Sequence, residues 1–365
     1  MKKLIAILTI FGLFLSVMPV PAMADTSKVQ ITRLWGQDRY ETASKIADEL
    51  AVQLGIDFSK GQQFQAVVLA SGNNWPDAVT GAPLARQYNA PILLLDDSPN
   101  SPYSGKTWAY IQAHVTKSAQ VFILGGTGVM PTTFTDYLVG LGLVKNNIQQ
   151  IGGIDRNETS LLIAKKLKNP SNVVNFVSDS NFYDALSTAA SDAHYFTPIL
   201  LISASGLSVN QKLFCDNFKT TSNWSPFVTI GELGNNIASL YPNANKNIVM
   251  GVNRYDTNSK LEYWDSRDTA IFLSTGLDYP DALAGAVLAG QLEGFIVLTD
   301  PKVLQSETVA ELNDLAYFEH NPQQWPDPSR RFYPTLYVLG GPGAVSDSVV
   351  NQTQAILTSD GYPKS

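Results

Sequence analysis

The sequence predicts an α/β protein in which a doubly wound module with a parallel sheet is repeated three times. Two observations carry this prediction. The same short motifs recur three times in the same order, and continuous apolar runs of strand length alternate with amphipathic helical patterns. The 365 residues are 44% hydrophobic and 16% charged, which is ordinary globular composition and excludes collagen-like, coiled-coil and disordered classes.

The first repeated motif has the form G-x-(D/N)-R-x-(E/D)-T and begins at Gly36, Gly153 and Gly251. An Asp or Asn with an acid three residues later is the spacing of a helix N-cap and its capping box. Apolar residues then fall on one helical face at 43–50 and again at 162–167. The motif therefore predicts the start of a helix in each module.

Apolar strands of four to eight residues follow each helix, which favours a parallel sheet buried on both faces. The first run, at 66–71, 173–178 and 270–275, leads into an aromatic residue, one further residue, and Asp-Ala. A second run, mostly Pro-Ile-Leu-Leu, covers 91–95, 198–202 and 294–298. A third ends in G-x-x-G at 125–128, 231–234 and 340–343.

The chain begins with the features of a secretory signal peptide. Lys2 and Lys3 precede an apolar run that stops at Pro19, too early for a membrane span, and a small-x-small site ends at Ala24. We expect a signal peptide over 1–24 and modules over 25–145, 146–245 and 246–365. The mature chain would lie outside the cytoplasm, without a membrane span.

Charge and residue counts exclude several classes of function. The net charge of −7 becomes −9 without Lys2 and Lys3, and −7 of this falls in 246–365, so a basic surface for nucleic acid or anionic lipid is disfavoured. One cysteine, Cys215, excludes an intramolecular disulfide, and three histidines give little support for a metal site. We predict no metal and no cofactor, with calcium bridging left open.

Eight side chains of the motifs are candidates for ligand binding, because loops after parallel strands gather at the edge where doubly wound folds bind ligands. They are Arg39, Arg156, Arg254, Asp77, Asp184, Asp281, Trp75 and Tyr279. Structural alternatives stay open: the acids cap helices or pair with the arginines, and the aromatic residues pack in the core or between modules. The helix dipole disfavours a cation in the first turn, so each arginine requires a carboxylate, a neighbouring module or an anionic ligand.

Catalysis is disfavoured by the same motifs. No His or Cys recurs at the repeated positions, and no nucleophile–base pair stands out. The G-x-x-G turns lack the lysine of a phosphate-binding loop. A carboxylate pair for glycoside hydrolysis stays open.

The segments 36–43, 75–78 and 279–282, the Pro-Ile-Leu-Leu strands and Leu124-Gly125-Gly126 together resemble the cell-wall-binding type 2 repeat. The resemblance covers essentially the whole mature chain in three copies. It implies Rossmann-like modules packed as a pseudo-threefold trimer within one chain. It also implies a surface protein of Gram-positive bacteria, held non-covalently on the wall by an anionic secondary cell-wall polysaccharide.

Departures from the family pattern predict that the modules do not bind equally. They are Asn157, Tyr183, Glu232, Asn253 and Gly294-Phe295. From the resemblance we expect a secreted, monomeric, non-catalytic protein whose arginines contact the polymer and whose acids order the same crevice. The alternatives are a wall hydrolase or amidase-related modifier, and a surface adhesin or scaffold module.

Overall fold

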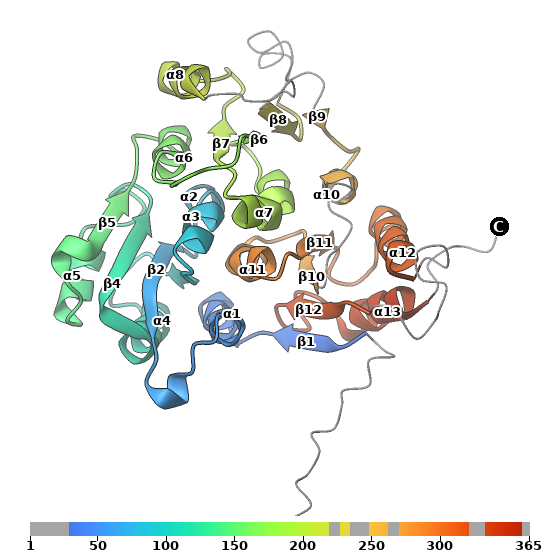
Figure 1. Ribbon diagram of the computed structural model, residues 1–365, viewed down its shortest axis with the longest axis horizontal. Coiled ribbons are helices and arrows are strands. Elements are labelled where there is room, and N and C mark those ends of the chain that lie inside the picture. Colours follow the sequence, from blue (N-terminus) through green and yellow to red (C-terminus); the bar gives the residue numbers. More distant parts are fainter. Residues whose placement is uncertain (1–28, 219–226, 234–247, 262–269, 321–332, 360–365) are drawn as a thin grey trace, which may run out of the picture.

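The computed structural model describes residues 29–218, 227–233, 248–261, 270–320 and 333–359, which form three α/β units around a common centre (Figure 1). The predicted α/β class with parallel sheets is confirmed. The predicted signal peptide, residues 1–24, lies outside the described residues, as does Gly234 of the second G-x-x-G turn.

The helix of the first motif and the apolar strands follow the predicted order in each repeat, and a strand that was not predicted precedes the motif. The first repeat contains β1 (Ile31–Leu34), α1 (Arg39–Gln53), β2 (Phe64–Ser71), α2 (Trp75–Val79), α3 (Ala82–Gln87), β3 (Ile92–Leu95), α4 (Pro102–His114), β4 (Val115–Leu124) and α5 (Thr133–Gly140). The second contains β5 (Ile148–Ile151), α6 (Arg156–Ala164), β6 (Val174–Ser178), α7 (Tyr183–Tyr195), β7 (Ile199–Ile202), α8 (Val209–Asn217) and β8 (Phe227–Ile230). The third contains β9 (Ile248–Val249), α10 (Arg254–Leu261), β10 (Ala270–Thr275), α11 (Pro280–Gln291), β11 (Phe295–Thr299), α12 (Ser306–His320), β12 (Thr335–Leu339) and α13 (Asp347–Thr358).

Each sheet takes its fourth strand from another repeat. The strand orders in the described part of the chain are β3-β2-β4-β5, β7-β6-β8-β9 and β11-β10-β12-β1, all parallel. Strands β1, β5 and β9, which lie at the start of the expected segments 25–145, 146–245 and 246–365, therefore belong to the sheet of the repeat before them. The first motif thus begins at the edge of a neighbouring sheet.

Strand β1 closes the three units into a ring. It pairs with β12 from Ile31↔Leu336 to Leu34↔Leu339, so opposite ends of the sequence share one sheet. Arg33 strengthens this closure, because its guanidinium donates to the carbonyl oxygens of Gly340 at 3.1 Å and Val345 at 2.9 Å.

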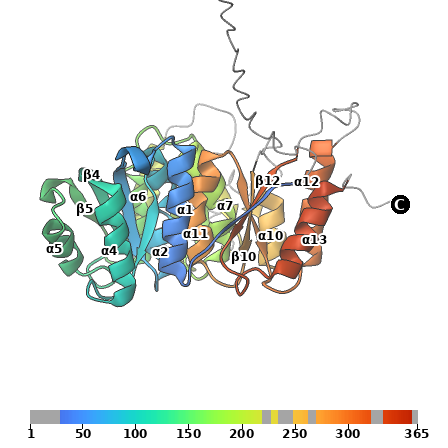
Figure 2. The ribbon, with the colours of Figure 1, turned by 90° about the horizontal axis from the view of Figure 1, so that it is seen from below.

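Helices α3, α7 and α11 pack against one another at the centre, between the three sheets (Figure 1). Figure 2 shows α11 beside α1. Around them one contact recurs: α1 packs on α11, α6 on α2, and α10 on α7. The first helix of each repeat thus always packs on a helix of the repeat before it, as expected of a pseudo-threefold trimer within one chain.

Small residues allow the central helices to approach closely. A Cβ atom added to Gly290 of α11 would lie 2.7 Å from Ala193 Cβ and 2.9 Å from the carbonyl oxygen of Ala190, both in α7. The Nδ1 atom of His194 lies 3.2 Å from the carbonyl oxygen of Gly290. Such contacts leave no room for a side chain at this crossing.

We expect Gly290→Ala to destabilise the protein by about 1–3 kcal/mol, because the new methyl group overlaps the backbone of α7. The matched control is Gly105→Ala in α4, where an added Cβ has nothing within 4 Å. There the higher helix propensity of alanine should stabilise by about 0.5–1 kcal/mol. Urea unfolding of both variants checks the pair, and equal effects would contradict the prediction.

Candidate functional site

The predicted N-caps are present at the start of all three helices that follow the first motif. Asp38 Oδ1 accepts from the Glu41 N–H at 2.9 Å. The equivalent bonds are Glu158 N–H to Asp155 Oδ1 at 2.8 Å and Asp256 N–H to Asn253 Oδ1 at 3.0 Å. The Asp or Asn of the motif is therefore explained by local backbone hydrogen bonding.

The acid and the threonine that end the motif also accept hydrogen bonds from nearby backbone N–H groups. In the first copy, Glu41 accepts from the Gln37 N–H at 3.1 Å, one residue before the N-cap, and Thr42 Oγ1 accepts from the Gly36 N–H at 3.1 Å. The same two bonds recur in the second and third copies. A Cβ on the glycine would overlap the Glu41 side chain, so the glycine is needed for space.

The three arginines bind the backbone of their own repeat. Each Nη1 donates to a carbonyl oxygen in the loop after the second strand of that repeat. The pairs are Arg39 with Gly72, Arg156 with Asp179 at 2.7 Å, and Arg254 with Gly276.

The same guanidinium groups lie over aromatic rings of the preceding repeat. Arg39 lies 5.8 Å from the centroid of Tyr279, Arg156 lies 5.8 Å from Trp75, and Arg254 lies 4.3 Å from Tyr183. A neighbouring module therefore supplies part of what a cation at a helix N-terminus requires. Tyr183 was recognised in the sequence only as a departure from the family pattern.

The carboxylates of Asp77, Asp184 and Asp281 do not cap helices, so the capping alternative is wrong. They lie within the first turns of α2, α7 and α11, whose N-caps make no side-chain hydrogen bond. Each carboxylate instead packs under the first glycine of a G-x-x-G turn. A Cβ on Gly125 would lie 2.9 Å from Asp77 Oδ2, and a Cβ on Gly231 or Gly340 would overlap its aspartate.

Positive φ values reinforce the need for glycine at these turns. They are 117° at Gly125, 74° at Gly231 and 95° at Gly340. L-residues with a side chain disfavour this region, and here the space for a side chain is also occupied by a carboxylate.

Burial controls the ionisation of the three carboxylates. It raises the pKa of Asp77 and of Asp281 to about 6, and raises that of Asp184. The arginine of the following repeat acts in the opposite direction in each case: Arg156 on Asp77, Arg254 on Asp184 and Arg39 on Asp281. Within the described residues no ion pair joins these partners, so the predicted buried pair is a longer-range attraction between repeats.

The three aromatic residues of the second motif pack between repeats. The ring centroid of Phe182 lies 6.4 Å from that of Trp75 and 5.9 Å from that of Tyr279. The Tyr279 hydroxyl donates to the carbonyl oxygen of Gly72 at 2.7 Å, and only 7% of Tyr279 is exposed. Of the two alternatives, packing at a module interface describes their arrangement.

The departures in the second repeat are coupled. A Cβ on Gly72 would lie 2.8 Å from Tyr40 Cε1, and the same close approach occurs between Gly276 and Tyr255. Asp179 occupies the position of these two glycines in the second repeat. There Asn157 replaces the tyrosine, so a side chain has room.

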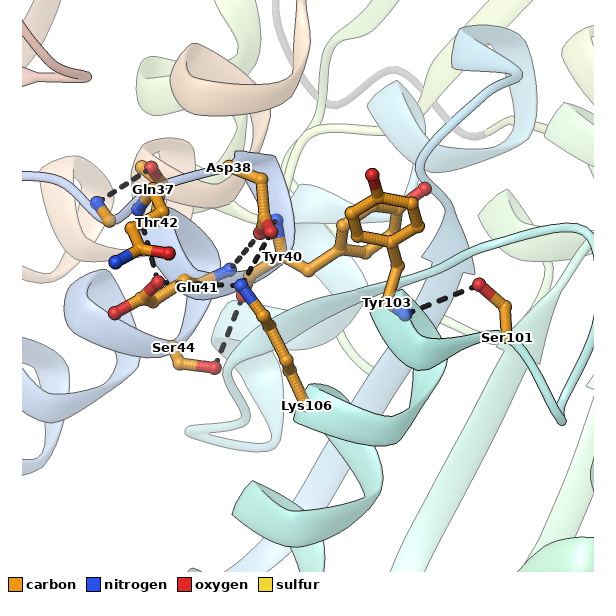
Figure 3. A network of polar contacts seen from close by, with 10 residues as sticks. Gln37, Asp38, Tyr40, Glu41, Thr42, Ser44, Ser101, Tyr103 and Lys106 are labelled. Atoms are coloured by element: carbon orange, nitrogen blue, oxygen red, sulfur yellow. Dashed lines mark hydrogen bonds and ion pairs between the residues drawn. The ribbon is translucent and has the colours of Figure 1, made fainter.

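Asn253 is explained by a similar exchange. In the first repeat Lys106 pairs with Asp38 at 2.7 Å and with Glu41 at 3.6 Å (Figure 3). Glu307 takes the place of Lys106 in the third repeat, and Asn253 Nδ2 donates to Glu307 Oε1 at 2.8 Å. An amide replaces the carboxylate where its partner is an acid.

The junction between the third and first repeats opens into a groove of about 330 Å³. Arg39, Asp278 and Asp281 line it together with Trp35 and the turn at 341–344. Trp35 was not among the predicted site residues. Comparing the residues that precede the three motifs, Trp35, Gly152 and Met250, would have singled it out.

The described residues show neither a metal-binding cluster nor a membrane-spanning helix. Among the described residues, no cluster of three or more His, Cys, Asp or Glu side chains is placed to hold a metal ion. No helix in that part of the chain has the length and apolar character needed to cross a membrane.

These features define a repeat protein whose three α/β units meet at junctions, each with an arginine of one repeat and a buried carboxylate of the repeat before it. The family described as cell wall binding domain 2 (CWB2) matches residues 33–135, 150–235 and 249–350. The chain belongs to this family, as the sequence motifs predicted.

Known relatives agree with this assignment. The chain is 27% identical over 308 residues to the N-acetylmuramoyl-L-alanine amidase LytC of Bacillus subtilis (strain 168), covering 84% of this chain and 57% of that protein. Its fold matches Cwp8 (TM-score 0.72, 22% identity) and Cwp6 (TM-score 0.73, 23% identity) of Clostridium difficile over 92% of its length. It covers 53% and 49% of those two chains, so it spans about half the length of the proteins it matches.

The raised pKa of Asp77 predicts a pH dependence of stability. Its folded pKa of about 6 lies above the unfolded value of 3.8, so its contribution is fully present below pH 4 and is lost as the pH rises to about 6. Asp77→Asn should therefore exceed the wild type in stability at pH 7.5 by on the order of 1–3 kcal/mol and match it at pH 4. Urea unfolding at both pH values measures this.

The control for this experiment is Asp136→Asn, which neutralises an exposed acid of the same repeat. Its effect should stay within about 0.5 kcal/mol at both pH values. Lower stability of Asp77→Asn at pH 7.5 would show that the charged carboxylate stabilises the junction.

The exchange of partners at Asn253 predicts a coupling with Glu307. Asn253→Asp keeps the N-cap but places a carboxylate against Glu307, and should cost about 0.5–1 kcal/mol at pH 7. Adding Glu307→Lys should recover this loss by recreating the pair seen at Asp38 and Lys106. A double-mutant cycle by urea unfolding tests the coupling, and additive effects would exclude it.

Proposed function

We propose that this protein attaches non-covalently to the Gram-positive cell wall by binding an anionic secondary cell-wall polysaccharide. Membership of the CWB2 family supports wall binding. The observation that carries the choice of an anionic polymer is the guanidinium group that recurs at all three junctions between repeats. The protein acts as a secreted monomer at the cell surface.

The three arginines differ in how available they are to a ligand. Arg156 is exposed, and within the described residues neither it nor Arg254 forms an ion pair. Arg39 is half-buried, and its Nη2 pairs with Asp278 at 3.2 Å. Anionic groups of the polymer would therefore engage Arg156 most readily and Arg39 least, which supports unequal binding by the modules.

Local fields overcome the negative net charge of the chain. Each arginine lies in the first turn of α1, α6 or α10, where the positive end of the helix dipole favours an anion. Three weak sites on one chain bind a repeating polymer more tightly than one, because each bound site raises the effective concentration at the others. A calcium ion bridging polymer and protein acids is an alternative that chelation tests.

We assign the region shared with LytC to attachment rather than to catalysis. The motif residues common to the three repeats cap helices, bind loop carbonyl groups and pack at junctions. The hydrolase alternative predicts a clearing zone when the protein is run on a gel containing purified wall. The adhesin alternative predicts no saturable binding to bare wall.

Arg156→Ala should weaken binding to purified sacculi by about tenfold, which is about 1.4 kcal/mol, with little loss of stability. The matched control is Lys165→Ala, which removes the same charge from an exposed position in the same repeat and should bind normally. Co-sedimentation measures both, before and after acid removal of the secondary polymer. Chelator is added in a parallel series.

Two results would overturn the proposal. Binding that persists on polymer-free sacculi would point to peptidoglycan as the ligand. Equal binding by Arg156→Ala and the wild type would exclude Arg156 from the polymer site.

A further inference from the structure

We propose that the groove at the junction of the third and first repeats binds a neutral sugar ring of the wall polymer, stacked on the indole of Trp35. This inference rests on the proposed wall-binding function and adds a ligand class for one of the three junctions between repeats. It assigns sugar recognition to this junction and recognition of anionic groups mainly to the other two.

Trp35 is held at the mouth of the groove by the closure of the ring. It follows β1 directly, and the preceding residue, Leu34, accepts from the Gly340 N–H at 2.9 Å. The indole packs on Gly341, where an added Cβ would lie 2.9 Å from Trp35 Cε3. Nevertheless 47% of Trp35 remains exposed.

The other two junctions lack this aromatic group. The bonds from Gly125 N–H to the Ile151 oxygen and from Gly231 N–H to the Val249 oxygen identify Gly152 and Met250 as the equivalents of Trp35. At Gly152 an added Cβ would overlap the backbone of Gly125 and Gly126, so no side chain fits. Of these three equivalent positions, the one at the junction of the third and first repeats carries an aromatic side chain, and the other two carry none.

The polar groups beside Trp35 suit hydroxyl groups better than a phosphate. Arg39 supplies donors, while Asp278, whose side chain is 51% exposed, and Asp281 supply acceptors in the same groove. Sugar hydroxyls both donate and accept, whereas a phosphate would meet two carboxylates. The volume of about 330 Å³ is at the lower end for small-molecule sites and suits one or two sugar rings.

The Trp35 indole contacts Gly341 and is otherwise partly exposed. It therefore offers a large apolar surface to a ligand. The C–H groups of a pyranose present a matching apolar face, and its hydroxyls project from the rim toward the polar residues. At this junction an exposed indole, a guanidinium and two carboxylates line one groove.

The test uses Trp35→Met, which copies the residue found at the equivalent position of the third repeat. The probe is the mixture of neutral oligosaccharides released from purified wall polymer by hydrofluoric acid, which cleaves phosphodiester bonds. Titration calorimetry on the mature chain should show binding by the wild type, with affinity at least about tenfold weaker for Trp35→Met. Trp35→Phe should retain most of the affinity.

Two controls separate this site from general effects. Tyr103→Leu removes another aromatic residue of the first repeat, 48% exposed and outside the groove, and should not change oligosaccharide binding. Arg156→Ala should weaken binding to sacculi but not to the neutral oligosaccharides. Thermal unfolding should show the same melting temperature for Trp35→Met, Trp35→Phe and the wild type.

The outcomes distinguish the two proposals. Binding of the wild type to sacculi, with no binding of neutral oligosaccharides or with equal affinity for Trp35→Met, would overturn the sugar site and leave wall attachment intact. Failure of the wild type to bind sacculi would overturn the wall-binding function. Oligosaccharide binding that is lost in Trp35→Met and kept in Trp35→Phe supports the sugar site.

Discussion

The structure depends on one constraint: the first strand of each repeat pairs in parallel with the sheet of another repeat. Through β5, β9 and β1, each G-x-(D/N)-R motif is delivered to the carboxyl edge of the neighbouring sheet. The pairing of β1 with β12 makes this relation cyclic, so each of the three junctions is formed by a pair of neighbouring repeats. Because a sheet edge left unpaired exposes a row of backbone groups, the same pairing also covers one edge of each sheet.

A buried aspartate of one repeat and the arginine of the next repeat attract each other across each junction. Each aspartate lies in the first turn of α2, α7 or α11, where the dipole favours an acid, yet burial still raises its pKa. The arginine of the following repeat acts against this rise without forming an ion pair with the aspartate, and its Nη1 is bound to a loop carbonyl. Under the proposed function, an anionic group of the polymer would therefore meet a cation whose position is already fixed, which reduces the entropy lost on binding.

Repetition of a stable frame allows the three sites to differ. Tyrosine against glycine in the first and third repeats becomes Asn157 with Asp179 in the second. The ion pair of Asp38 and Lys106 becomes a hydrogen bond between Asn253 and Glu307. Each substitution is accompanied by a substitution of the residue it contacts. The backbone arrangement is therefore kept, while the charge and the aromatic surface differ between the three junctions.

The sequence alone determined the buried strands of each repeat, the helix that follows the first motif and the N-cap of that helix, because these depend on contacts within a few residues. It did not predict β1, β5 and β9. The bonds of Asp38, Glu41 and Thr42 close within six positions of one another and so leave a visible spacing. Only the tertiary structure decided which repeat completes each sheet, since a period in the sequence is the same for every cyclic partner. It also decided the place of Asp281 under Gly340 and of Trp35 on Gly341, because contacts between distant segments leave no fixed spacing to read.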